Sequence, residues 1–207
     1  MKKISIRINS VLLEGILSLP KTAKGIVLFA HGSGSSRLSP RNTFVASVLQ
    51  KEDIATLLID LLTEEEDEVY ETRFDINLLT RRLIEIVKWL QKHPETKDLS
   101  IGLFGASTGA AAALKVAAVL GSAIKAVVSR GGRPDLANEI LDRVKSPTLL
   151  IVGGNDFGVI ELNESAYSLL RCEKKLEIVE GATHLFEEKG ALEKVAELAV
   201  DWFKEYL

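Results

Sequence analysis

The sequence has 207 residues, of which 46% are hydrophobic and 27% charged, and a formal net charge of −3. This is the composition of a globular protein with a sizeable core, and it lacks the basic excess typical of nucleic-acid binding. Cys172 is the only cysteine, so the chain cannot form an internal disulfide. No signal-peptide core and no apolar run of about 18 residues is present. We therefore expect one domain over residues 1–207, a cytoplasmic location, and neither a nucleic acid nor a membrane as partner.

The first expected elements are the two strands of a hairpin. Apolar and polar residues alternate over residues 3–9, and after Asn9 and Ser10 an apolar segment runs over residues 11–19. Alternation with a period of two, interrupted by a short polar turn, predicts a β-hairpin, and we expect both strands at the edge of a sheet. Residues 25–30 then form a continuous apolar run, which is typical of a strand buried on both faces.

From that run onward, helix and strand patterns alternate. We expect helices near 40–52, 75–92, 108–120, 135–144, 163–170 and 191–206, and strands at 54–59, 99–104, 125–129, 148–152 and 175–179. Repeated strand–helix units predict an α/β fold with a doubly wound, mostly parallel sheet of about eight strands and helices on both faces. Because residues 130–146 offer only one short helix, we also expect a minimal lid.

Five consecutive acidic residues, Glu64 to Glu68, stand between an expected strand and the next helix. Neighbouring carboxylates in a loop do not converge on one point, and no histidine lies beside them. We expect a solvated loop here, and we expect neither a metal site nor a cofactor in the chain.

Ser107 stands between Gly105 and Gly109, after an apolar strand and before an alanine-rich helix. A G-x-S-x-G pattern in this context is typical of a nucleophile elbow, in which a strained turn projects the serine hydroxyl above the sheet. Thr108 opens the helix, so its backbone N–H is a candidate oxyanion donor. The bare pattern is also compatible with an ordinary strand-to-helix turn, so partners for Ser107 must be sought elsewhere.

The three histidines differ in the edge of the sheet at which each is expected to lie. In an open parallel sheet, functional groups gather beyond the carboxyl ends of the strands. His184 follows the last strand at that edge and is the candidate general base. His31 follows an earlier strand but enters a glycine-containing turn, which indicates a structural role. His93 falls in a helix-to-strand connection at the opposite edge, where a surface position is expected.

The candidate acid is Asp156, which follows the strand at 148–152. It lies between Ser107 and His184 in the chain order of α/β-hydrolases, and from there it can orient the imidazole. Asp60 precedes the serine and Asp135 lies one strand too early, so both are second choices. A purely loop-stabilising aspartate is the alternative role for Asp156.

The second oxyanion donor is expected in the loop after the strand at 25–30. Residues 31–34 form that loop, and their small side chains allow the backbone to approach a reacting carbonyl. The backbone N–H of Ser33 is the candidate donor, and that of Gly34 is the alternative.

Several segments together resemble the dienelactone-hydrolase-like branch of the α/β-hydrolases over nearly the full chain. The matching segments are residues 29–37, 39–42, 57–63, 104–113, 129–136 and 181–186. The resemblance implies an α/β-hydrolase fold with Ser107, Asp156 and His184 as the catalytic triad. It differs from the founding dienelactone hydrolases in carrying serine instead of cysteine as the nucleophile, and its acid loop, residues 155–158, is an unusual version.

The sequence therefore predicts a serine hydrolase that cleaves small ester, lactone or related acyl substrates through an acyl-enzyme on Ser107. One alternative is a ligand-binding or scaffold protein that keeps the fold without significant turnover, because fold alone does not establish activity. Another is a domain that serves a phosphotransfer or nucleotide pathway.

Four arginines lie in loops at the same edge as Ser107. Arg37 and Arg41 follow the candidate oxyanion loop, and Arg130 and Arg133 follow the strand at 125–129. The guanidinium group suits carboxylate and phosphate, so these residues predict a small-molecule substrate that carries an anionic group. Pairing with loop carboxylates such as Asp135 is the alternative.

Overall fold

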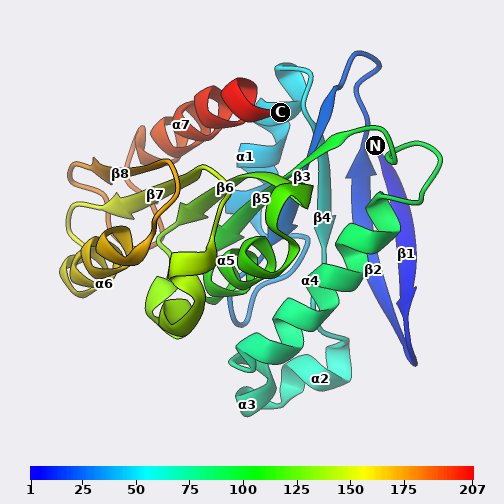
Figure 1. Ribbon diagram of the computed structural model, residues 1–207, viewed down its shortest axis with the longest axis horizontal. Helices are drawn as coiled ribbons and strands as arrows, with labels where there is room; N and C mark the ends of the chain where they lie inside the picture. Colours follow the sequence, from blue (N-terminus) through cyan, green and yellow to red (C-terminus); the bar gives the residue numbers. More distant parts are fainter.

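A computed structural model describes all 207 residues and contains one eight-stranded sheet with the order β1-β2-β4-β3-β5-β6-β7-β8 (Figure 1). The strands are β1 (Lys2–Ile8), β2 (Val11–Ser18), β3 (Gly25–Ala30), β4 (Ala55–Ile59), β5 (Ser100–Ala106), β6 (Ile124–Arg130), β7 (Thr148–Gly153) and β8 (Lys174–Val179). The helices are α1 (Pro40–Lys51), α2 (Glu64–Glu68), α3 (Tyr70–Arg73), α4 (Ile76–Leu90), α5 (Thr108–Leu120), α6 (Phe157–Leu169) and α7 (Ala191–Tyr206), with 3₁₀ segments η1 (Gly121–Ala123) and η2 (Pro134–Arg143).

The sheet is parallel except at its N-terminal end. β1 pairs antiparallel with β2, β2 pairs antiparallel with β4, and all remaining pairs are parallel. The expectation of two edge strands was wrong for β2, which lies inside the sheet; only β1 is at this edge. The hairpin satisfies one hydrogen-bonding side of β2, and the other side remains available for β4.

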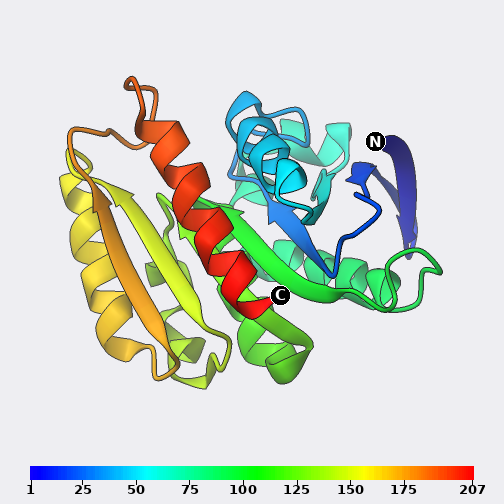
Figure 2. The ribbon, with the colours of Figure 1, turned by 90° about the horizontal axis from the view of Figure 1, so that it is seen from above.

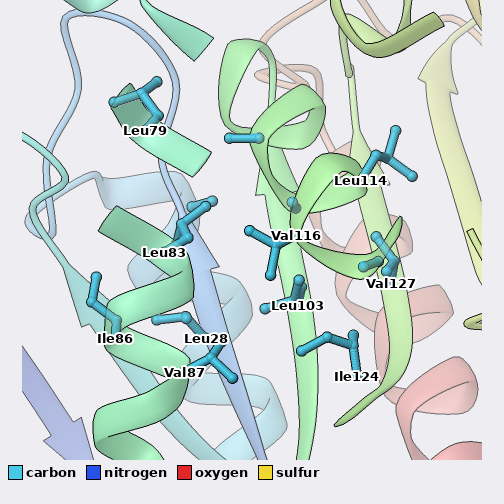
Figure 3. Close-up of a cluster of buried hydrophobic side chains, with 14 of the residues drawn as sticks. Leu28, Leu79, Leu83, Ile86, Val87, Leu103, Leu114, Val116, Ile124 and Val127 are labelled. Atoms are coloured by element: carbon cyan, nitrogen blue, oxygen red, sulfur yellow. The ribbon is translucent and has the colours of Figure 1, made fainter. Parts of the chain in front are cut away.

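The two faces of the central strands are covered by different helices. α4, α5, α6 and η2 cover one face, and α1 and α7 cover the other (Figures 1 and 2). Leu28 and Leu103 belong to the first of the two cores, whereas their chain neighbours Phe29 and Phe104 belong to the second. Figure 3 shows how Leu28 and Leu103 meet side chains from α4 and α5. Burial on both faces explains why these strands are continuous apolar runs.

Two expected helices differ in extent or type. α6 begins at Phe157 and not near residue 163; Asp156 is its N-cap residue, and Gly158 is part of the helix. The expected helix at 135–144 is the 3₁₀ segment η2. It is the only regular element between β6 and β7, as the expected minimal lid requires. The longest helix, α7, has 16 residues, and none of the helices is long and apolar enough to span a bilayer.

The acidic run from Glu64 to Glu68 forms the helix α2, so the expected loop was wrong. Thr63 caps the helix through a reciprocal box, in which its hydroxyl accepts from Glu66 N–H and the Glu66 carboxylate accepts from Thr63 N–H. Glu66 also forms two 2.5 Å hydrogen bonds with the buried guanidinium of Arg82. These bonds hold the pKa of Glu66 below its usual value. This carboxylate is therefore an ion-pair partner and not a solvated charge.

Candidate active site

Ser107 occupies a sharp turn between β5 and α5. Its backbone angles are φ 50° and ψ −121°, a combination that residues with a side chain rarely adopt. The turn requires glycine on both sides of it. A Cβ atom at Gly105 would lie 2.4 Å from Cα of Ala110, and one at Gly109 would lie 2.2 Å from the carbonyl oxygen of Ala30. This close packing of β5, α5 and β3 holds the serine at the carboxyl edge of the sheet.

Hydrogen bonds from two neighbouring segments fix the strained serine backbone. Ser107 N–H donates to the carbonyl of Arg130 at 3.2 Å, and Ser107 C=O accepts from the N–H groups of Ala110 and Arg133, both at 3.1 Å. Strain of this kind persists only where the surroundings over-determine it. The Ser107 side chain is partly exposed at the carboxyl edge of the sheet.

Asp156 and His184 are in direct contact at the same edge. Oδ2 of Asp156 lies 2.6 Å from Nδ1 of His184, and their side chains are 16% and 38% exposed. Asn155 connects the two loops, because its backbone N–H donates to Ala182 C=O at 2.9 Å and its side-chain amide donates to Gly181 C=O at 3.0 Å. The unusual acid loop thus places its carboxylate on the imidazole.

His184 lies against Gly131, next to the segment that binds the serine backbone. Gly131 directly follows Arg130, whose carbonyl accepts from Ser107 N–H, and a Cβ atom at Gly131 would lie 3.5 Å from both Nδ1 and Cε1 of His184. Ser107 Oγ makes no hydrogen bond to His184 in this structure. Such bonds are often long without substrate and tighten when it binds.

The other two histidines are engaged in structural contacts. Nε2 of His31 accepts from Leu61 N–H at 3.0 Å, so Nδ1 carries the proton and donates to Gly32 C=O at 2.9 Å. Burial lowers the pKa of this imidazole. His93 stacks on Trp89 with a ring-centroid distance of 4.3 Å.

The two second-choice acids are both bound to arginines. Asp60 accepts from the backbone N–H of Arg37 at 2.6 Å and forms an ion pair with its guanidinium. Asp135 forms a bidentate pair with Arg133 at 2.8 and 2.7 Å. Neither carboxylate forms a hydrogen bond or ion pair with a histidine, and the acid that binds His184 is Asp156.

The expected oxyanion donors differ in their availability. Thr108 is the first residue of α5, so its N–H has no acceptor within the helix. Ser33 N–H, the candidate second donor, already donates to Thr108 Oγ1 at 2.9 Å. It lies next to the elbow, since a Cβ atom at Gly32 would lie 3.2 Å from Cβ of Ser107.

A hollow of about 320 Å³ opens beside this loop and contains more acidic than basic groups. Two of its arginines, Arg37 and Arg73, are paired with carboxylates. The lining residues are His31, Ser35, Ser36, Arg37, Leu38, Asp60, Leu62, Thr63, Glu64, Asp67, Glu68 and Arg73.

Comparison with known proteins places the chain in a family. A family model described as the dienelactone hydrolase family matches residues 42–207. The chain belongs to the dienelactone hydrolase family. The match includes Ser107, Asp156 and His184 and starts after the loop that contains Ser33.

Solved structures of similar proteins show the same fold. A dienelactone hydrolase from Anabaena variabilis is 55% identical and has a TM-score of 0.97, with 100% of this chain and 97% of that chain covered. Est1E from Butyrivibrio proteoclasticus is 17% identical and has a TM-score of 0.85, with 98% of each chain covered. These neighbours confirm the expected α/β-hydrolase fold.

A curated relative from Mycobacterium tuberculosis is 52% identical over 206 residues. It is named a phosphoribosyl transferase, and the name itself marks that assignment as provisional. The match covers 100% of this chain and 46% of the relative, so the chain spans about half the length of that protein.

Sequence reasoning missed three features that organise the site. These are the side-chain amide of Asn155, the turn at Gly131 and the backbone N–H of Arg133. The consecutive glycines after β6 were the available signal for a close approach at Gly131. The acceptors of Asn155 and of the Arg133 N–H lie in distant segments, and no local pattern indicates them.

Proposed function

We propose that this chain is a serine hydrolase that cleaves small ester, lactone or related acyl substrates through an acyl-enzyme on Ser107. The 2.6 Å contact between Asp156 and His184, beside a serine held in the strained elbow conformation, carries the proposal. Family membership and the 55% identical dienelactone hydrolase support hydrolase chemistry.

In the proposed reaction, Ser107 Oγ attacks the acyl carbon and transfers its proton to Nε2 of His184. Asp156 keeps the proton of His184 on Nδ1 and stabilises the imidazolium. The leaving group then takes the proton from Nε2 and departs. Water, deprotonated by the same histidine, attacks the acyl-enzyme and releases the acid together with free serine.

The oxyanion of the tetrahedral intermediate receives the N–H of Thr108, reinforced by the positive end of α5. In the proposal, Ser33 N–H is the second donor and exchanges its bond to Thr108 Oγ1 for one to the oxyanion. That exchange is local, because the hydroxyl belongs to the residue that supplies the first donor.

Small substrates are proposed because η2 alone stands between β6 and β7. No inserted helices are present there to enclose a long acyl chain. The contact between Asp156 and His184 at this edge supports acyl transfer as the reaction of this chain.

The test combines active-site labelling with turnover. A fluorophosphonate probe should label the protein once, and Ser107→Ala should abolish both labelling and hydrolysis of 4-nitrophenyl butyrate. Ser35→Ala, which changes a serine in a neighbouring loop, serves as the matched control and should label normally. Labelling that persists in Ser107→Ala would refute the assignment. A wild-type protein that neither labels nor turns over short esters would favour a ligand-binding or scaffold role.

A further inference from the structure

The four arginines near the site fall into two groups according to their partners. Arg37 is paired with Asp60, and Arg133 is paired with Asp135 through both of its carboxylate oxygens. Both charges are thus neutralised within the protein. Arg41 and Arg130 form the second group, and they lack an equivalent internal counter-ion.

Arg130 is a buried cation without a carboxylate partner. The residue is only 6% exposed, and its guanidinium lies 5.8 Å from the ring centroid of Phe186. One nitrogen, Nη2, contacts Asn42 Oδ1 at a long 3.4 Å, and Nε has no hydrogen-bond partner. A buried charge that is unpaired is costly, so its presence indicates a partner absent from the chain itself.

Arg41 adds a second positive charge beside it. Its Nε is also buried without a partner, and its only carboxylate is that of Glu187, which lies 3.3 Å away and is 66% exposed. Burial and then the charge of Arg41 lower the pKa of Arg130 to about 10, which leaves Arg130 charged at neutral pH. An anion that contacts both guanidinium groups would relieve their repulsion.

The backbone of Arg130 adjoins the serine elbow. The carbonyl of Arg130 accepts from Ser107 N–H, and Phe186 is the second residue after His184. Arg41 lies in the first turn of α1, a 12-residue helix whose positive end adds to the local field. The hollow beside the Ser33 loop has the opposite character, with four carboxylates, from Asp60, Glu64, Asp67 and Glu68, against two arginines.

We propose that Arg41 and Arg130 bind the anionic group, carboxylate or phosphate, of the substrate whose acyl bond Ser107 cleaves. This inference rests on the proposed function. It assigns no ligand to Arg37 and Arg133, because their guanidinium groups already bind carboxylates of the chain. The anionic end of the substrate is directed toward α1 and away from the acidic hollow.

The kinetic test compares mono-4-nitrophenyl glutarate, which carries a carboxylate, with the neutral 4-nitrophenyl valerate. Arg41→Gln and Arg130→Lys should each raise KM for the glutarate ester about tenfold or more, the loss expected for one charge-assisted hydrogen bond, and change KM for the valerate ester little. Arg37→Gln and Arg133→Gln should affect both esters equally. Equal effects of the Arg41 and Arg130 variants on the two esters would overturn the proposal.

A binding test examines this inference separately from the proposed hydrolysis, because it requires no turnover. In a Ser107→Ala background, which cannot turn over, inorganic phosphate and glutarate are titrated separately while the Tm is followed. Binding of either anion should raise the Tm in proportion to its occupancy, and the anion that binds at the lower concentration identifies the favoured chemistry. The rise should be lost in Arg130→Met and Arg41→Gln. It should be unchanged in Arg171→Gln, which changes an exposed arginine between α6 and β8.

Two further results are decisive. Without added anion, Arg130→Met should be at least as stable as the wild-type protein, because the variant removes a buried unpaired charge. Glu187→Gln should tighten anion binding, because it removes the competing carboxylate of Arg41. An anion-dependent rise in Tm that is the same with and without Arg130 would refute the site. If Arg130→Met does not fold, the Arg41→Gln and Glu187→Gln titrations decide the question.

Discussion

Oδ2 of Asp156 lies 2.6 Å from Nδ1 of His184, although the two residues belong to loops that follow different strands. In the proposed mechanism this contact fixes the tautomer that accepts the serine proton at Nε2. Asp156→Asn should therefore lower kcat for a short ester by about 10⁴-fold with little change in KM, because the amide favours the wrong tautomer.

Steady-state kinetics of three further variants check this assignment. Asp142→Asn, at an exposed position, is the neutral control and should retain full kcat. Asp60→Asn and Asp135→Asn remove carboxylates that bind arginines and should change kcat by much less than Asp156→Asn. If either of them matches the loss expected for Asp156→Asn, then a different carboxylate orients the histidine.

The glycines on either side of Ser107 give a prediction about stability. Gly105→Ala and Gly109→Ala each place a methyl group against backbone atoms, so each should lower the free energy of unfolding by about 1–3 kcal/mol or more. Gly158→Ala is the matched control: its Cβ would meet open space at the start of α6, and it should be neutral or stabilising by up to about 1 kcal/mol. Urea denaturation measures all three. Wild-type stability in Gly109→Ala would contradict the close approach of α5 to β3.

The ion pair between Glu66 and Arg82 predicts unequal roles for the five acidic residues of α2. Glu66→Gln weakens the hydrogen bonds to a buried guanidinium and should cost about 1.5–3 kcal/mol of unfolding free energy at pH 7. The exposed Glu68→Gln should cost little. Because the folded-state pKa of Glu66 is lowered, its contribution is present above about pH 4.5 and is lost as the pH falls through the folded-state pKa. The difference between wild type and Glu66→Gln in urea denaturation should therefore shrink in acid.

The buried His31 predicts a pH dependence of stability near neutrality. Burial lowers its folded-state pKa below the ordinary value of 6.5, so the unfolded chain binds more protons as the pH falls below 6.5. The contribution of His31 to stability is complete above that pH and decreases as the solution becomes more acidic. In His31→Gln, the free energy of unfolding should fall less between pH 8 and pH 5.5 than in wild type. Equal slopes for the two proteins would show that His31 does not titrate in this way.

Most of the fold follows from local patterns in the sequence. The central strands were predictable because burial on both faces requires a continuous run of apolar residues. The helix after Ser107 was predictable from its alanine-rich sequence. α2 was missed although its signal was present, since Thr63 and Glu66 have the spacing of a capping box. The early start of α6 was missed because Phe157 and Gly158 are individually weak helix formers.

The sequence predicted which loops contribute to the candidate site. It did not predict which side chains in those loops pair with one another. Chain order and sheet edge together selected Ser107, Asp156 and His184, whose catalytic roles stay predictions. The four arginines could not be separated, because the partner of Arg37 lies 23 residues away in another loop and Arg130 has none. The bond from Ser33 N–H to Thr108 Oγ1 also joins distant segments, so no local pattern indicated it.

In the proposed mechanism, the position of the acid and the base in the sheet determines how activity would be lost. Asp156 follows β7 and His184 follows β8, whereas Ser107 follows the central strand β5. β8 is an edge strand that pairs only with β7, and most of its side chains are partly or fully exposed. Strands of this kind open locally at a lower free energy than a sheet interior. Local opening of β8 would move His184 away from Ser107, which stays in place because β5 lies inside the sheet. Heat or denaturant should therefore inactivate the protein before it unfolds as a whole.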